Sequence, residues 1–178
     1  MARKEMARKT KPRNRGKAVK KTPDADASLR KELAELLKGG NAHVSITDAA
    51  ADFPAEKRGE LANGLPHSGW QLLEHIRIAQ WDLLEFSRNS KHKSPDFPDG
   101  YWPKTPAPPS DAAWKKSVEA IKSDLRAMVA LVSDPRSDLH AALPWGTGQT
   151  LLREALVLAD HNAYHVAQLV DLRRALGV

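Results

Sequence analysis

Two histidines lie four residues apart near the C-terminal end of the chain, as His161 and His165 in the run ADHNAYHVAQL. On a helix, a spacing of four places both side chains on one face, with Cβ atoms about 5–6 Å apart. Neutral imidazoles at this separation can bind one metal ion, because nitrogen ligands suit zinc, nickel and related ions. The pair alone is a weak signal, and two core histidines with ordinary hydrogen bonds are the alternative interpretation.

A third histidine, His75, lies in the run WQLLEHIRIAQWDLLEF. At 3.6 residues per turn it shares a helix face with five apolar side chains: Leu72, Ile76, Ala79, Leu83 and Phe86. Three imidazoles that converge inside a protein are costly to bury without partners, and one divalent cation supplies a partner for each. Three histidine ligands also leave coordination positions for water or substrate, as in reactive metal sites. We therefore predict that His75, His161 and His165 bind one divalent metal ion, nickel or zinc.

Segments with helical periodicity must position these residues, and the sequence has four long ones: residues 28–37, 69–86, 110–133 and 150–175. A short helix with Thr47 as its N-cap is expected between the first two. Ser68 and Gln71 form a capping-box pattern at the start of the second segment. On the last segment the histidine pair shares the predicted buried face with four other residues: Val157, Leu158, Gln168 and Leu172.

These helices, with no convincing strand and no internal repeat, predict an all-α four-helix bundle that occupies residues 23–178 as a single domain. The helix topology stays open because the connections are long. Residues 87–110 contain six prolines and are expected to form a loop. Asp160 and Asn162 are expected to point away from the metal-binding face. The remaining histidines lie in predicted loops and are assigned no chemistry: His43, His67, His92 and His140.

The second helical segment is apolar on two faces. Trp70, Trp81 and Leu84 form a second stripe, which a neighbouring helix or a second subunit would cover. Because large exposed apolar patches are uncommon on soluble monomers, we expect a homodimer. As an alternative, the proline-rich loop with Tyr101 and Trp102 covers the stripe within one chain.

The net charge of +6 is concentrated at one end of the chain. Residues 1–22 hold ten lysines and arginines and one glutamate, whereas the remainder has 18 basic and 21 acidic residues, a net charge of −3. The first segment has almost no apolar side chains and is predicted to be a disordered tail. Such a tail can bind nucleic acid through its positive charge. We favour a solubilising extension, because no aromatic residues are interleaved with the basic ones.

The chain contains no cysteine, which excludes a disulfide framework, a zinc ribbon and a cysteine nucleophile. No stretch approaches the about 20 apolar residues that span a bilayer. The N-terminus also lacks the apolar region of a secretory signal. These features favour a soluble cytoplasmic protein without a membrane partner.

Two stretches, HSGWQLLEHIRIAQWDLLEF and TLLREALVLADHNAYHVAQLVDLRRALG, resemble the two signature helices of the DinB-like superfamily. This is a damage-inducible, metal-binding family of four-helix bundles that includes YfiT-type proteins, and the resemblance covers about residues 28–177. In that family, one histidine of the second helix and an HxxxH pair of the last helix bind a divalent metal, commonly nickel or zinc. The matching positions here are His75, His161 and His165.

The resemblance implies a metal-dependent enzyme that acts on a small molecule. Some relatives resemble thiol-dependent S-transferases or isomerases, in which the metal activates the thiol of a low-molecular-weight cosubstrate, and others resemble hydrolases. The absence of cysteine is compatible with a thiol that arrives with the cosubstrate. An alternative from another class is a non-catalytic interaction protein that binds nucleic acid through its basic tail.

Overall fold

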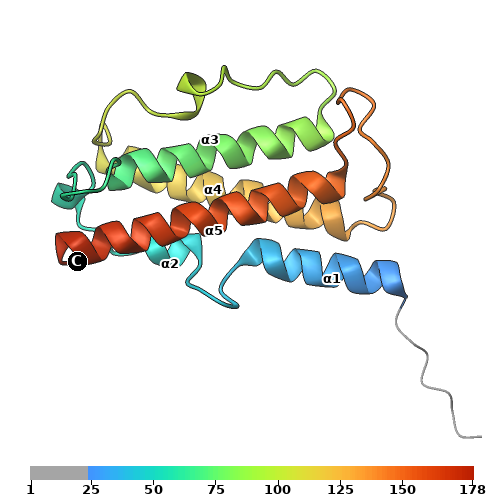
Figure 1. Ribbon diagram of the computed structural model, residues 1–178, viewed down its shortest axis with the longest axis horizontal. Helices are drawn as coiled ribbons and strands as arrows, with labels where there is room; N and C mark the ends of the chain where they lie inside the picture. Colours follow the sequence, from blue (N-terminus) through green and yellow to red (C-terminus); the bar gives the residue numbers. More distant parts are fainter. Residues whose placement is uncertain (1–23) are drawn as a thin grey trace, which may run out of the picture.

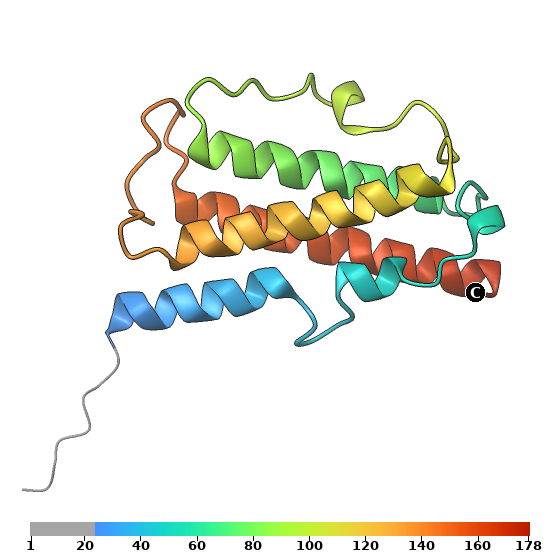
Figure 2. The same cartoon turned by 180° about the vertical axis from the view of Figure 1, so that it is seen from behind.

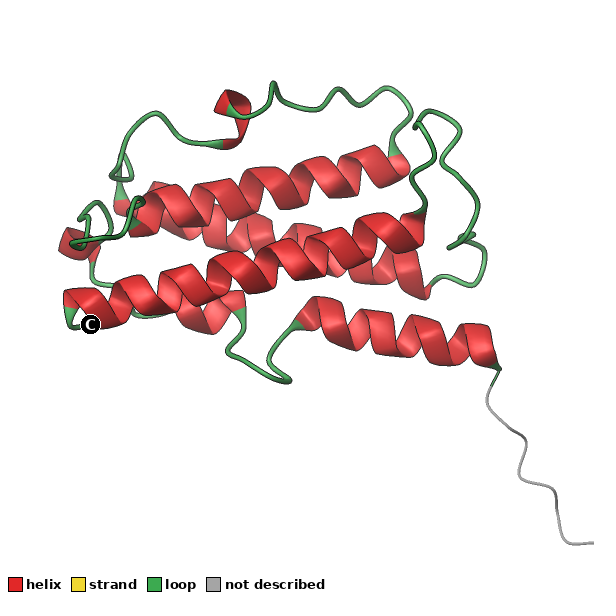
Figure 3. Ribbon diagram, viewed as in Figure 1, coloured by secondary structure: helices red, strands yellow, loops and turns green. Residues whose placement is uncertain are grey.

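The computed structural model describes residues 24–178, and it confirms the all-α prediction for them, since no strand occurs in this range. The five α-helices are α1 (Ala25–Lys38), α2 (Ile46–Ala50), α3 (Gly69–Arg88), α4 (Asp111–Ser133) and α5 (Leu151–Leu176) (Figures 1 and 3). Two single-turn 3-10 helices, η1 (Ala55–Lys57) and η2 (Asp99–Tyr101), lie in the connections. Among these described helices, none combines the length and apolarity that crossing a membrane requires. The predicted basic tail, residues 1–22, lies outside the described residues.

The four long helices lie side by side, and each packs against two neighbours in the order α3, α4, α1, α5 and back to α3 (Figures 1 and 2). The chain runs in the same direction along α3 and α4, so the proline-rich segment between them travels back along the length of the molecule (Figure 1). Helix α5 runs opposite to α3 and packs closely against it. This pairing sets the histidine of α3 against the pair on α5.

The helix ends depart from the sequence expectations at three positions. Helix α1 begins at Ala25 instead of residue 28, because the Asp24 carboxylate caps it by accepting a hydrogen bond from the Asp26 amide. Helix α2 is capped by Ser45, and the expected cap Thr47 lies inside its first turn. The capping box predicted at the start of α3 is confirmed, with both of its hydrogen bonds present. Helix α3 also continues two residues beyond the expected end, to Arg88.

The buried faces of α3 and α5 follow the 3.6-residue period, but some residues predicted to be buried lie at the edge of a face and are partly exposed. On α3, Leu72, Ile76 and Ala79 are buried as predicted, whereas Leu83 and Phe86 are only partly covered. On α5, the buried face runs through Leu151, Ala155, Leu158, Val166, Leu169 and Leu172. Val157, which we expected on that face, is 36% exposed. Its side chain lies one turn before His161, at the border between the buried face and solvent.

The second stripe of α3 is largely covered within one chain. Trp70 and Leu84 are buried and belong to core clusters that include Trp114 and Met128 of α4. Trp81 remains 37% exposed, and the edge of its ring system meets His92 of the following loop. The homodimer stays a prediction, but this stripe no longer supplies a reason for it.

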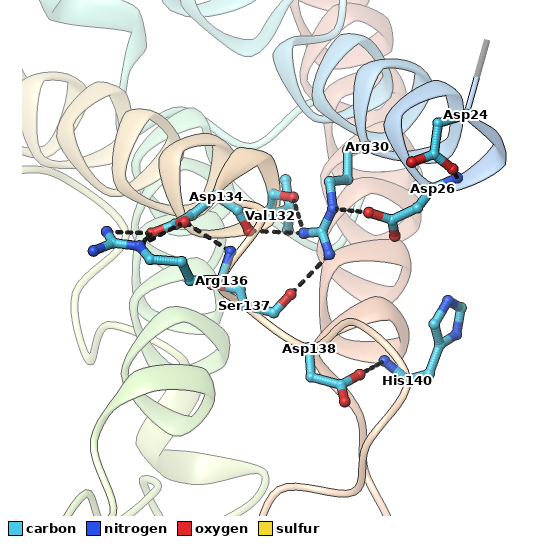
Figure 4. Close-up of polar contacts among 9 residues, drawn as sticks. All are labelled: Asp24, Asp26, Arg30, Val132, Asp134, Arg136, Ser137, Asp138 and His140. Atoms are coloured by element: carbon cyan, nitrogen blue, oxygen red, sulfur yellow. Dashed lines mark hydrogen bonds and ion pairs between the residues drawn. The ribbon is translucent and has the colours of Figure 1, made fainter.

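A buried arginine joins α1 to the end of α4 (Figure 4). Arg30 is 8% exposed, and one of its terminal nitrogens donates to the carbonyl oxygens of Val132 and Asp134, both at 2.9 Å. The other donates to the carbonyl of Ser137 at 2.8 Å, and Nε donates to Asp26 at 2.7 Å. Helix C-termini leave carbonyls without intrahelical donors, and this guanidinium supplies them.

Candidate metal centre

The structure brings together the three histidines that the sequence singled out. His75 Nε2 lies 3.1 Å from His165 Nε2 and 3.0 Å from His161 Nε2. One nitrogen from each ring falls within 4.8 Å of the others, and no other cluster of this kind occurs among residues 24–178. His75 and His165 are buried, and His161 is partly buried. The packing of α3 against α5 therefore places three nitrogen donors around one point.

Hydrogen bonds on the far side of two rings fix which nitrogen carries the proton. His75 Nδ1 lies 2.9 Å from the carbonyl oxygen of Tyr101, and His165 Nδ1 lies 2.7 Å from Gln168 Oε1. Carbonyl oxygens only accept, so both Nδ1 atoms donate and both Nε2 atoms present lone pairs. These lone pairs face each other across 3.1 Å, which is unfavourable unless a positive charge lies between them.

The donor set fits a divalent transition metal. Nitrogens about 2.1 Å from a shared ion, at angles of about 90–110°, are separated by about 3.0–3.4 Å. The Nε2 atoms of His161 and His165 lie 3.0 and 3.1 Å from His75 Nε2, which is in that range. Imidazole ligands suit zinc, nickel and related ions, whereas calcium and magnesium prefer oxygen ligands.

Burial keeps these imidazoles neutral. It lowers the pKa of His161 to about 4, with a further lowering from the neighbouring imidazoles of His165 and His75. Burial also lowers the pKa of His165 to about 4, against the opposing effect of its hydrogen bond to Gln168. The pKa of His75 is lowered for the same reason. All three nitrogens are therefore available as ligands near neutral pH without first losing a proton.

His161 differs from the other two histidines because its Nδ1 is buried without a hydrogen-bond partner. Asn162 Oδ1 is likewise a buried acceptor without a partner, although its Nδ2 donates to Gln80 Oε1 at 2.9 Å. Asn162 is therefore tied to α3 through Gln80, and Asp160 is exposed to solvent. The free Nδ1 leaves His161 able to adopt the tautomer that exposes Nε2 to an ion.

Three aromatic residues border the site, and none of them was predicted to lie there. Trp102 stacks on His75, with ring centroids 3.8 Å apart and planes 1° apart. His67, which we assigned no chemistry, stacks on Trp102 at 4.1 Å. Tyr101 supplies the carbonyl that orients His75. All three lie in the connections between the long helices, where no periodic pattern marks a residue as facing a site. His43 and His140, by contrast, are exposed, in keeping with their lack of an assigned role.

A small, mainly apolar pocket lies near the histidine cluster. Leu72 and Gln168 line it, and each lies three residues, about one helical turn, from a candidate ligand on its own helix. The rest of its wall comes from Leu65, Pro66, His67 and Leu172. Its volume is only about 30 Å³, the scale of a water molecule, and none of the three candidate ligands lines it.

Comparisons of this chain with protein-family models, with curated proteins and with solved structures give no match. Family membership is therefore not shown. The case for a metal site therefore rests on its geometry. Three neutral imidazoles converge, and hydrogen bonds hold two of them in a fixed tautomer.

Proposed function

We propose that this protein is a divalent-metal-binding four-helix bundle of the DinB-like type, in which His75, His161 and His165 hold one nickel or zinc ion. The observation that carries the proposal is the opposition of two lone pairs. Tyr101 and Gln168 direct the Nε2 atoms of His75 and His165 at each other across 3.1 Å. A bound cation removes that conflict and gives each buried imidazole a partner.

We further propose a metal-dependent thiol S-transferase or hydrolase that acts on a small molecule. A divalent ion in such a site supplies Lewis-acid activation of a coordinated thiol or water. The chain's own residues provide neutral ligands and a stacked aromatic wall at Trp102. Because the chain has no cysteine, any thiol must come from a low-molecular-weight cosubstrate.

Metal content of the purified protein tests the first proposal. We expect about one nickel or zinc ion per chain, and loss of most of it in both His75→Ala and His161→Ala. The control His140→Ala removes an exposed loop histidine and should keep full occupancy. Full occupancy in His75→Ala, with loss in His161→Ala, would show that the pair on α5 uses another ligand. A metal-free wild-type protein that also takes up no added nickel or zinc would refute the site.

Reaction class requires a separate screen on the metal-loaded protein. Electrophilic small molecules are offered with and without low-molecular-weight thiols, and ester and amide substrates are offered without them. Turnover that needs a thiol and disappears in His75→Ala would support the transferase, whereas thiol-independent turnover with the same dependence would support the hydrolase. Turnover that persists in His75→Ala would argue against both.

A further inference from the structure

The proline-rich segment between α3 and α4 is fastened to α3 by one buried carboxylate. Asp82 is 7% exposed and lies on α3. Its Oδ1 lies 2.7 Å from His92 Nε2, and its Oδ2 accepts a hydrogen bond of 2.6 Å from the Tyr101 hydroxyl. His92 and Tyr101 are nine residues apart in the loop, so Asp82 holds two separate points of it against the helix.

Tyr101 connects this fastening to the histidine cluster. Its hydroxyl binds Asp82, while its backbone carbonyl accepts the hydrogen bond from His75 Nδ1 at 2.9 Å. Asp82 follows His75 by seven residues, which places it on the same side of α3 about 10 Å further along the axis. One residue of the loop therefore spans both positions, and the next residue, Trp102, stacks on His75.

We propose that Asp82 and Tyr101 are positioning residues of the metal centre, acting through the Tyr101 carbonyl on the orientation and tautomer of His75. This inference rests on the proposed metal site. Groups that hydrogen-bond the outer nitrogen of a ligating histidine fix its ring, and losing them commonly weakens metal affinity about 10- to 100-fold. Here the outer group is a backbone carbonyl, whose place depends on the tyrosine hydroxyl being held at Asp82.

The hydrogen bond between Tyr101 and Asp82 should persist near neutral pH. Burial and the adjacent carboxylate raise the pKa of the Tyr101 hydroxyl, so it keeps its proton and remains a donor near neutral pH. A hydrogen bond from a neutral donor to a carboxylate is among the stronger kinds in proteins. The second donor, His92, satisfies the other oxygen of Asp82.

Co²⁺ binding to the full chain, followed by its visible absorption, tests the inference. Tyr101→Phe removes only the hydroxyl and keeps the carbonyl and the ring. The matched control is Tyr164→Phe, which changes the only other tyrosine of the chain; its ring contacts His165, and the residue is 62% exposed. We expect Tyr101→Phe to weaken Co²⁺ binding about 10- to 100-fold, with an altered spectrum, while Tyr164→Phe matches the wild type.

A double-variant cycle separates positioning from general loop stability. If Asp82 and Tyr101 act through one hydrogen bond, Asp82→Ala combined with Tyr101→Phe binds Co²⁺ about as weakly as Asp82→Ala alone. Side-chain ¹⁵N signals of metal-free protein supply a second readout. We expect His75 to show protonated Nδ1 and free Nε2 in the wild type, and a changed pattern in Tyr101→Phe.

The outcomes distinguish this inference from the proposed function. Unchanged Co²⁺ affinity and unchanged His75 signals in Tyr101→Phe would overturn the positioning role while leaving the metal site intact. Independent, additive losses in the double variant would also overturn it. A wild-type protein that binds no Co²⁺ would overturn the metal site, and the positioning role at a metal with it.

Discussion

Replacing Arg30 with methionine is expected to lower the free energy of unfolding by about 3 kcal/mol. Methionine keeps much of the apolar stem, so the loss comes mainly from the guanidinium, which donates to three carbonyls at the end of α4 (Figure 4). The Val132 oxygen is buried, and leaving such an acceptor without a donor costs about 1–3 kcal/mol. The contacts to Asp134 and Ser137 are only part-buried, so water replaces them at a cost of about 0.5–1 kcal/mol each.

Urea denaturation followed by circular dichroism measures this loss, and thermal unfolding gives an independent value. For a domain of this size, about 3 kcal/mol corresponds to a fall of about 6–12 °C in melting temperature. Arg30→Lys keeps the charge and can reach fewer of the carbonyls, so its loss should be intermediate. Both should be measured on protein with matched metal content, since bound ligand shifts apparent stability.

Arg136→Met is the matched control, because Arg136 pairs with Asp134 at the same helix end with its side chain 89% exposed. An exposed ion pair contributes little to stability, so this variant should remain close to the wild type. If Arg30→Met were no less stable than Arg136→Met, the buried guanidinium would not be what fastens α1 to α4. The capping role assigned to it here would then be wrong.

Three further outcomes are expected. Because the pKa values of His161 and His165 are lowered to about 4, protons compete with the metal ion only at low pH. Equilibrium dialysis should therefore show metal occupancy retained at pH 6 and lost near pH 4. Metal release centred at pH 6.5 would contradict this. Gln168→Leu removes the acceptor for His165 Nδ1 and should weaken metal binding about 10- to 100-fold in a chelator competition, whereas Gln168→Glu should preserve it. Deleting residues 1–22 removes a charge of +9 and should abolish any salt-sensitive DNA binding in an anisotropy titration; equal binding by the shortened chain would place that affinity elsewhere.

The ligand set could be predicted because helices carry it. Periodicity on two segments placed His75 inward and His161 beside His165, and the packing of α3 on α5 brings them together. The period fixes which residues share a face, but it does not fix where that face meets solvent. Val157 shows the difference, since it lies on the predicted stripe and yet at its exposed border. The start of α1 was missed for a related reason, because its first turn is capped by Asp24 before the leucine stripe begins.

The orientation of the ligand imidazoles could not be predicted from the sequence. It depends on a backbone carbonyl and on a contact between residues far apart in the chain, and neither leaves a pattern in the sequence. The carbonyl that fixes His75 belongs to the backbone of Tyr101, and any residue at that position would supply one. Only the hydroxyl of Tyr101 depends on its type, and its partner Asp82 lies 19 residues earlier, on α3. Helix spacing thus specifies which nitrogens meet, while the fastening of this loop specifies which of them present lone pairs. If helix spacing and loop anchoring have these separate roles, the Tyr101→Phe variant should keep its three histidines adjacent but bind metal weakly. The His75→Ala variant should lose the site itself.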